Sequence, residues 1–404
     1  MKGLSVPPQS ERRGHWPAAL VILVALVAFV FPAMPAAQAQ FMVVGNDEKV
    51  WWDDTGKQIN QAPGKDTVGI YDIKSPATPK LLATLQLENS ICGPPVNIAV
   101  TPSGDIALVA NSVTQVKDGD AWKPQPDTKI YVIDLKASPP KQIATIEGGK
   151  QPSGMAINKK GDLALVANRA DSSISVLSIA GKEVKLVGSV PVGDSVATVA
   201  ITPDGKHAIA IKNTVNKVAW LDIDGQKVTY NKYDMIVGNF PYNVDITPDG
   251  KIAIVNNNGN AGAADGNVDT VAIVDLEAMP PRVIDFVVVG DGPEGLAISP
   301  KGNLAVSVLL RGGNGDKKAF YYHKNGSLAV LKISGKKVTK IGEVEVGGLP
   351  EAAEFSPDGK YLYVGNFIDG DMSIFKVDGT KLTDTGKRMK IDGHPAAMGV
   401  SPPK

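Results

Sequence analysis

Short runs of apolar residues, four to eight long and separated by turn residues, recur along the whole chain after residue 40. None of them shows the 3.6-residue period of an amphipathic helix, so the pattern predicts strands throughout. One unit, a strand that ends in a tight turn with Pro in six of its seven copies, recurs at intervals of 44 to 57 residues, a spacing typical of propeller blades. The copies are VNIAVTPSG (96–104), GMAINKKG (154–161), ATVAITPDG (197–205), YNVDITPDG (242–250), EGLAISPKG (294–302), EAAEFSPDG (351–359) and AAMGVSPPK (396–404).

Each complete copy is followed by three more predicted strands. After the second copy, for example, LALVAN (163–168) and SSISVLSI (172–179) follow, and a weaker fourth strand leads into the next Gly-containing turn. Small and apolar residues occupy both faces of the inner strands, as expected for a sheet packed between two neighbouring sheets. The sequence therefore predicts an all-β fold, a seven-bladed β-propeller with four antiparallel strands per blade, as a single domain over 40–404.

The two ends of the chain complete each other. FMVVGN (41–46) resembles the second strand of a repeat, so the first blade lacks its innermost strand. AAMGVSPPK (396–404) is an innermost strand with no blade after it. We expect the C-terminal strand to join the N-terminal blade and close the ring, because this leaves no open sheet edge inside it.

The first 39 residues have the layout of a secretory signal peptide. Lys2, Arg12 and Arg13 precede an apolar run over 18–31, and the small residues Ala37 and Ala39 then define a cleavage site. The apolar run is short for a membrane span. We therefore predict cleavage, a periplasmic or secreted location and no membrane association afterwards; the export route, Sec or twin-arginine, stays open.

Charge and composition exclude some classes of partner and an internal disulfide. The predicted leader carries a net +2 and the whole chain is neutral, so the mature chain carries about −2, which argues against nucleic acid as a partner. A single cysteine, Cys92, excludes an internal disulfide. The 42 glycines and 29 prolines agree with many tight turns.

The YVGN and LVAN strands, together with the TPDG corners, resemble the YVTN-type repeat of the seven-bladed lactonase-like propeller group. The resemblance covers essentially the whole mature chain and implies the propeller fold. It implies less about activity, because the group includes lactone hydrolases, haem-binding domains and proteins of unknown role, and a fold by itself assigns no chemistry. We carry no catalytic residue of the group over to this chain, and C-x-x-C-H and G-x-S-x-G are both absent.

Strand order assigns every loop to one of two faces. The Pro-containing corners lie on one face, here called the corner face; the turns from second to third strands lie on the other, the insertion face. All long insertions belong to the insertion face: 47–65, 112–127, 258–268 and 310–325. Aromatic residues beside charges are typical of recognition surfaces, although the rings could instead cap the blades. The predicted binding residues are Trp51, Trp52, Trp122, Arg311, Tyr321, Tyr322 and His323 on the insertions, with Tyr242 and Asn243 at the axial mouth.

The same axial mouth holds the candidates for chemistry. Glu294, Glu351 and His394 are the candidate catalytic residues. Oxygen ligands from several blades could hold Ca²⁺, the one cofactor considered, and its candidate ligands are Asn97, Asn243, Glu294 and Glu351. Asp245 and Glu354 also depart from the small residues of other repeats. The alternative is that these carboxylates are merely solvated near the axis.

Two functions follow from these observations. The first is an exported, non-catalytic protein that binds a small molecule or an exported protein through its insertion face. The second is a lactone or sugar-acid hydrolase that uses the axial carboxylates, with or without calcium.

Overall fold

The structure, a computed structural model, describes residues 3–5, 8, 40–261 and 263–403. The predicted signal peptide, 1–39, lies almost wholly outside this range. Residues 40–403 form seven four-stranded antiparallel sheets, which confirms the predicted all-β, seven-bladed propeller. In the described part of the chain, no helix has the length and hydropathy that a bilayer crossing would need.

The first four blades, each from the innermost to the outermost strand, have these bounds. Blade 1 contains β32 (Pro395–Val400), β1 (Phe41–Asn46), β4 (Thr67–Asp72) and β5 (Lys80–Gln86); blade 2 contains β6 (Ile98–Val100), β7 (Ile106–Ala110), β10 (Lys129–Asp134) and β11 (Lys141–Glu147); blade 3 contains β12 (Pro152–Ile157), β13 (Leu163–Asn168), β14 (Ser173–Ala180) and β15 (Glu183–Pro191); blade 4 contains β16 (Val196–Ile201), β17 (His207–Lys212), β18 (Lys217–Asp224) and β19 (Lys227–Ile236).

The remaining blades follow the same order. Blade 5 contains β20 (Pro241–Ile246), β21 (Ile252–Asn257), β22 (Asp269–Asp275) and β23 (Arg282–Gly290); blade 6 contains β24 (Pro293–Ile298), β25 (Leu304–Leu309), β26 (Ser327–Ser334) and β27 (Lys337–Glu345); blade 7 contains β28 (Pro350–Phe355), β29 (Tyr361–Asn366), β30 (Asp371–Asp378) and β31 (Lys381–Lys390). A single 3₁₀ turn, η1 (Asn213–Val215), joins β17 to β18.

The ring closes as predicted. The C-terminal strand β32 pairs with β1 in blade 1, from Met42 opposite Val400 to Asn46 opposite Pro395. Just beyond β32, the backbone N–H of Phe41 donates to the Ser401 hydroxyl (2.9 Å). Met398 of β32 packs in the same apolar cluster as residues of blade 7, so the last strand also fills the interface between the first and last blades.

The Pro-Asp-Gly corners are built alike. At one of them, the Thr202 hydroxyl accepts the backbone N–H of His207 (3.0 Å), and the Gly205 N–H donates to the Thr202 carbonyl (2.8 Å). Gly205 has a φ of +71°, a conformation that glycine adopts without strain. The corner therefore turns the chain from an inner strand to the second strand in very few residues.

The core lies between the blades. Seven apolar clusters each join two adjacent blades, and together they complete the ring. An eighth cluster lies under the insertions and is described below with the site. Each blade therefore packs both of its faces, one against each neighbouring blade, and the twist of the sheets accommodates this arrangement.

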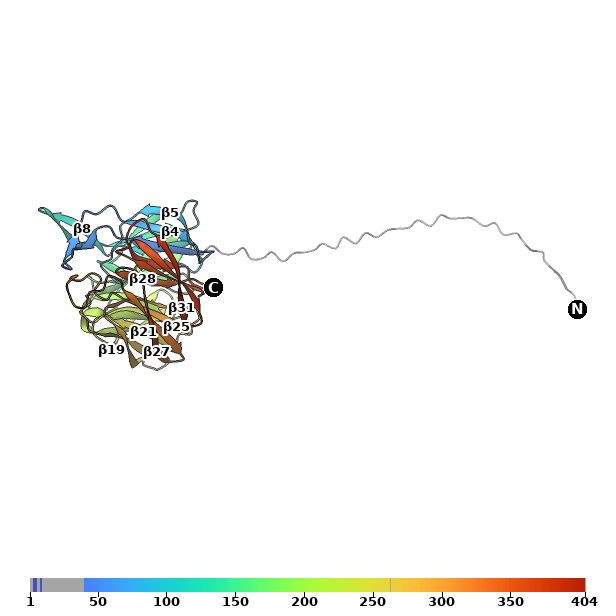
Figure 1. Ribbon diagram of the computed structural model, residues 1–404. Coiled ribbons are helices and arrows are strands. Elements are labelled where there is room, and N and C mark those ends of the chain that lie inside the picture. The colour runs from blue at the N-terminus through green and yellow to red at the C-terminus, as the bar shows by residue number, and fades with distance from the viewer. Residues whose placement is uncertain (1–2, 6–7, 9–39, 262, 404) are drawn as a thin grey trace. The chain divides into compact units, whose positions relative to one another are not determined.

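The insertions have secondary structure of their own. The first contains the hairpin β2 (Val50–Trp52) and β3 (Gln58–Asn60), and the second contains β8 (Val113–Asp118) and β9 (Ala121–Pro126). The β8–β9 hairpin projects from the ring (Figure 1). A β-bridge between Thr55 and Asp316 joins the first insertion to the fourth, so the insertions support one another.

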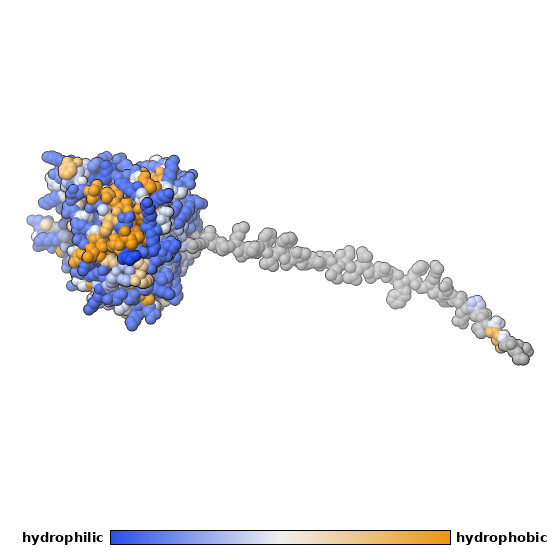
Figure 2. Space-filling view, turned by 90° about the horizontal axis from the view of Figure 1, so that it is seen from below, coloured by the Kyte–Doolittle hydropathy of each residue, from blue (hydrophilic) through white to orange (hydrophobic). Residues whose placement is uncertain are grey.

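The outer rim carries an apolar surface. Hydrophobic side chains gather on the side of the propeller where Figure 1 labels β19 and β27 (Figure 2). Between these strands lies β23, on which Ile284, Phe286 and Val288 are exposed. Each of the other six outer strands contains at least one lysine, which protects a sheet edge from unwanted pairing, whereas β23 contains none.

Candidate functional site

A pair of carboxyl groups lies near the propeller axis on the insertion face. Glu294 and Glu351 occupy the same second position of the adjacent inner strands β24 and β28, and a hydrogen bond joins their side chains. Both are buried, 6% and 2% exposed. Burial raises the pKa of Glu294 to about 7 and that of Glu351 well above its usual range. The two groups therefore share one proton at neutral pH, with Glu351 as the acid.

Arg169 provides a positive charge beside this pair. Its guanidinium donates to the carbonyl of Cys92 (3.2 Å), and its charge partly offsets the effect of burial on the pKa of Glu294. Both Arg169 and Cys92 are partly exposed, whereas the two carboxyl groups are buried. The arginine follows the second strand of its repeat, where other repeats have Ser112, Asn213, Asn258, Leu310 and Phe367. That departure was the signal in the sequence, and our sequence analysis missed it.

Tyr242 and Cys92 complete the axial cluster. Tyr242 is 6% exposed, and burial, then the charge of Glu294, raise the pKa of its hydroxyl well above the usual value. Burial also raises the pKa of the Cys92 thiol to about 11. The thiol therefore stays protonated at neutral pH and is a poor nucleophile.

The turn that carries Cys92 is held by a buried ionic network. Lys49 is completely buried, and its ammonium group contacts Asp66, the carbonyl of Asn89 and, at 3.5 Å, Asp47. Burial alone would lower the pKa of Lys49, yet the two carboxylates raise it. Lys49 is thus a permanent cation inside the first insertion.

The same carboxylates bind the backbone of the turn. Asp47 accepts the N–H of Ile91 (2.8 Å) and Asp66 that of Asn89 (3.2 Å). The apolar cluster under the insertions also includes Ile91, with Cys92 and Trp51 packed against it. The network therefore positions the segment whose carbonyl accepts the Arg169 hydrogen bond.

His394 has other partners than the glutamate pair. Its Nδ1 donates to the carbonyl of Phe367 (2.7 Å), and its ring meets Trp51 edge to face at 4.9 Å between centroids. Its Nε2 lies 3.9 Å from Glu48. The structure thus places the third candidate catalytic residue beneath the aromatic insertion and not at the pair.

The candidate calcium ligands have partners within the protein. The amide nitrogen of Asn97 donates to the Ala110 carbonyl (2.7 Å), and Asn243 accepts the backbone N–H of Val244 (2.8 Å). Glu294 and Glu351 are engaged with each other. Among the described residues, no group of three or more His, Cys, Asp or Glu side chains is arranged to hold a metal ion. We derive no step through Ca²⁺.

Most of the predicted binding residues line one of two grooves. Trp51, Trp52 and Tyr322 line a groove of about 360 Å³ between the first and fourth insertions. Arg311, Tyr321 and His323 line a second groove of about 280 Å³, at the junction of blades 5 and 6. Trp122 lies apart on the β8–β9 hairpin, and Tyr242 and Asn243 lie at the axis.

Two carboxylates lie elsewhere than the sequence analysis placed them. We expected Asp245 and Glu354 at the mouth on the insertion face. They instead line a cavity together with corner residues such as Pro203 and Pro248. Each inner strand runs from the insertion face to the corner face, so its fifth position lies nearer the corners than its second.

Comparison with known proteins supports the fold. No protein-family model matches this chain, and no curated protein matches its sequence. Among solved structures, a 6-phosphogluconolactonase-like protein from Bacteroides uniformis has a TM-score of 0.68 at 14% identity, covering 90% of this chain and 99% of its own. A similar protein from Bacteroides fragilis has a TM-score of 0.65 at 19% identity, covering 91% and 99%.

A third structure is the periplasmic gluconolactonase PpgL of Pseudomonas aeruginosa. Its TM-score is 0.65 at 17% identity, covering 89% of this chain and 98% of that protein. At these identities the three likenesses show a shared propeller fold of the same extent. The chemistry of this chain has to be argued from its own residues.

Proposed function

We propose that this protein hydrolyses a lactone of a sugar acid at the Glu294–Glu351 pair. The observation that carries the proposal is a buried carboxyl pair that holds one proton beside an arginine, on the face where the insertions gather. Three proteins of the same fold are described as gluconolactonases or 6-phosphogluconolactonase-like, which supports this function over simple binding.

The pair has the groups that ester hydrolysis needs. Glu294, in its carboxylate form, takes a proton from water, whose oxygen attacks the lactone carbonyl. The Arg169 guanidinium stabilises the negative charge that develops on the carbonyl oxygen. Glu351 gives its proton to the ring oxygen as the acyl C–O bond breaks. The product is the hydroxy acid, and the pair ends with the one proton that it held at the start, now on Glu294.

Neutralising the pair by isosteric substitution tests this role. We expect Glu294→Gln and Glu351→Gln each to reduce kcat for glucono-1,5-lactone at least 100-fold, the range found for general acid–base groups. The wild-type rate should rise as the pH passes about 7, where Glu294 loses its proton. The measurement is the rate above spontaneous hydrolysis. An exposed glutamate on an outer strand, changed as Glu183→Gln, is the control.

The aromatic groove separates hydrolysis from the second candidate function, binding alone. Trp52→Ala should raise KM if the groove holds the substrate, because exposed tryptophans stack on apolar faces of ligands. Turnover that is absent from the wild type, or unchanged in Glu294→Gln and Glu351→Gln with melting curves intact, would contradict the hydrolase. The groove would then remain as a surface for a small molecule or an exported protein.

We also propose that the protein is exported to the periplasm, as a member of the YVTN-type repeat proteins. The three-part pattern of residues 1–39 supports this, as does the periplasmic location named for one structural neighbour. Expression of the full chain in a Gram-negative host should yield a periplasmic product that begins at Gln40. N-terminal sequencing of fractionated cells checks this, and an uncleaved cytoplasmic product would contradict it.

A further inference from the structure

The corner-face end of the axis contains a well that the proposed hydrolysis does not use. Its volume is about 350 Å³, and inner strands of six blades and the segment after β32 line it. Most of its wall is apolar, with Val96, Met155, Val199, Val244 and Leu296 among the lining residues. This wall suits a hydrocarbon group, because burial of apolar surface is favourable in proportion to its area.

Two carboxyl groups interrupt the apolar wall. Asp245 accepts backbone N–H groups at both oxygens, from Ile246 (2.8 Å) and from Ile298 of the next blade (2.7 Å), so its carboxylate is held in place. Glu354 accepts no hydrogen bond from any described residue, and it is still partly accessible from the well. The well therefore has one fixed carboxylate and one carboxyl group without a protein partner.

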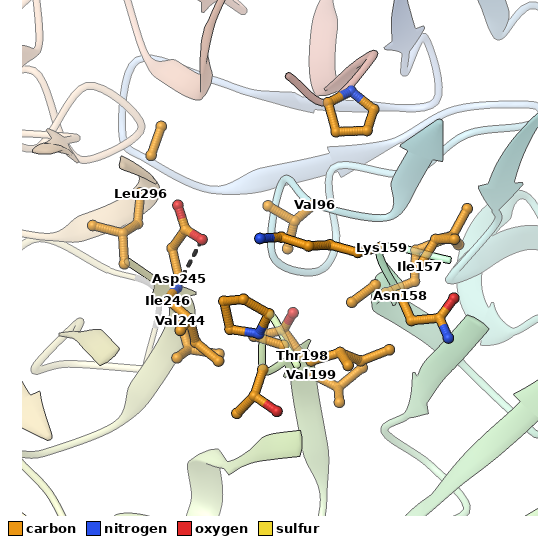
Figure 3. A pocket seen from close by; sticks show the side chains of 18 of the residues that line it. Val96, Ile157, Asn158, Lys159, Thr198, Val199, Val244, Asp245, Ile246 and Leu296 are labelled. Atoms are coloured by element: carbon orange, nitrogen blue, oxygen red, sulfur yellow. Dashed lines mark hydrogen bonds between the residues drawn. The ribbon is translucent and has the colours of Figure 1, made fainter. Parts of the chain in front are cut away.

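Among the described residues, no basic side chain forms an ion pair with either carboxyl group. Lys159 is the single basic side chain among the described residues of the lining, and it is exposed at the rim. It extends over the well from the side opposite Asp245 (Figure 3), but no ion pair joins the two. The two carboxyl groups are therefore available to a cation from outside, which would favour their ionised form.

We propose that this well binds an organic cation with an apolar body, of the alkylammonium class. The ammonium group donates hydrogen bonds to Glu354 and Asp245, and the alkyl chain packs against Val244, Leu296 and Met155. Asp245 and Glu354 come from blades 5 and 7, on either side of blade 6, so one ammonium group between them makes charge-assisted bonds to both.

Protonation makes this binding pH-dependent. Burial raises the pKa of Asp245 to about 6, and burial together with Asp245 raises that of Glu354 to about 8. Below these values the carboxyl groups are neutral and attract a cation less, while an alkylammonium ion keeps its charge. Affinity should therefore rise between pH 6 and pH 9.

Calorimetric titration of the full chain with hexylammonium chloride tests the site. We expect saturable binding at one site per chain at pH 8.5, with 1-hexanol and hexanoate binding at least tenfold more weakly. Glu354→Gln should weaken hexylammonium binding tenfold or more, and it disturbs no hydrogen bond of the fold. The matched control is Glu277→Gln, which removes a carboxylate from the corner face outside the well, where Glu277 pairs with Lys336 (3.0 Å).

The titration has clear contrary results. Equal affinity for hexanol and hexylammonium would show a merely apolar pocket and overturn the cation site, and so would an unchanged affinity in Glu354→Gln. Absence of any binding at pH 8.5 would overturn it as well. None of these results touches the hydrolase, whose residues lie at the other end of the axis, so the two proposals fail separately.

Discussion

A chain without residues 395–404 is expected not to form a cooperative fold. The deletion removes β32 and leaves the hydrogen-bonding edge of β1 open toward the axis, from Met42 to Asn46. It also removes Ala397 and Met398 from the clusters that join blade 1 to blades 2 and 7. Because every blade packs on two neighbours, the loss at one interface opens the ring and exposes apolar surface on both sides of the gap.

The measurement is thermal unfolding followed by circular dichroism, with size-exclusion chromatography to detect aggregation. The control is a chain that ends at Ser401, since this residue still pairs with Phe41 (2.9 Å) and β32 stays complete. We expect the control to melt like the wild type and the longer deletion to show no sharp transition. A sharp transition at the wild-type temperature in the longer deletion would refute the role of β32 in closure.

The fold could be predicted from the sequence because its causes are local and repeated. A TPDG corner, an apolar second strand and an Asn at its end predict the same structure wherever they recur, as in YLYVGN of β29. Ring closure could be predicted as well, because the N-terminal blade lacks an innermost strand and the C-terminus provides one. The blade architecture and the ring closure can both be predicted from strand order alone, without knowledge of side-chain contacts.

The site was harder to predict because its causes are contacts between blades. The hydrogen bond of Glu294 to Glu351 and the position of Arg169 depend on how three blades converge at the axis. His394 was placed on the right face, but a turn of the chain directs it to Glu48 and Trp51. The repeat pattern identifies which residues differ from the other copies. It does not show which of these residues are in contact in the folded protein.

Lys49 is the clearest example of a residue that the pattern could not reveal. In the sequence it is one of the polar residues of an insertion, DEKVWW, and a lysine there is expected to be solvated. In the structure it is completely buried between Asp47 and Asp66. Its role depends on the distant Asn89, whose carbonyl it contacts.

Replacing this cation is expected to have a large effect on stability. Lys49→Met keeps much of the side-chain volume but leaves two buried carboxyl groups without their counter-ion. Breaking a buried ion pair by removal of one partner costs about 3–5 kcal/mol of unfolding free energy. Lys57→Met, in the exposed part of the same insertion, is the matched control and should cost less than about 0.5 kcal/mol.

The pH dependence separates lost charge from lost packing. Burial raises the pKa of Asp47 to about 6 even with Lys49 present, so its carboxyl group binds a proton more readily in the folded state than in the unfolded state. Without Lys49, a neutral Asp47 at pH 5 needs no counter-ion, whereas at pH 8 it is charged or must hold its proton at a cost. The deficit of Lys49→Met should therefore be larger at pH 8 than at pH 5.

A further substitution decides between the two causes. If charge is responsible, adding Asp47→Asn and Asp66→Asn to Lys49→Met should restore part of the stability, since amides need no cation. The gain is partial because each amide oxygen keeps only one of the two backbone N–H groups that the carboxylate accepts. A deficit that is equal at both pH values and is not relieved by the amides would mean that packing alone is lost. Because the network holds the turn of Cys92, whose carbonyl binds Arg169, Lys49→Met should also lower the hydrolysis rate at temperatures where the ring remains folded.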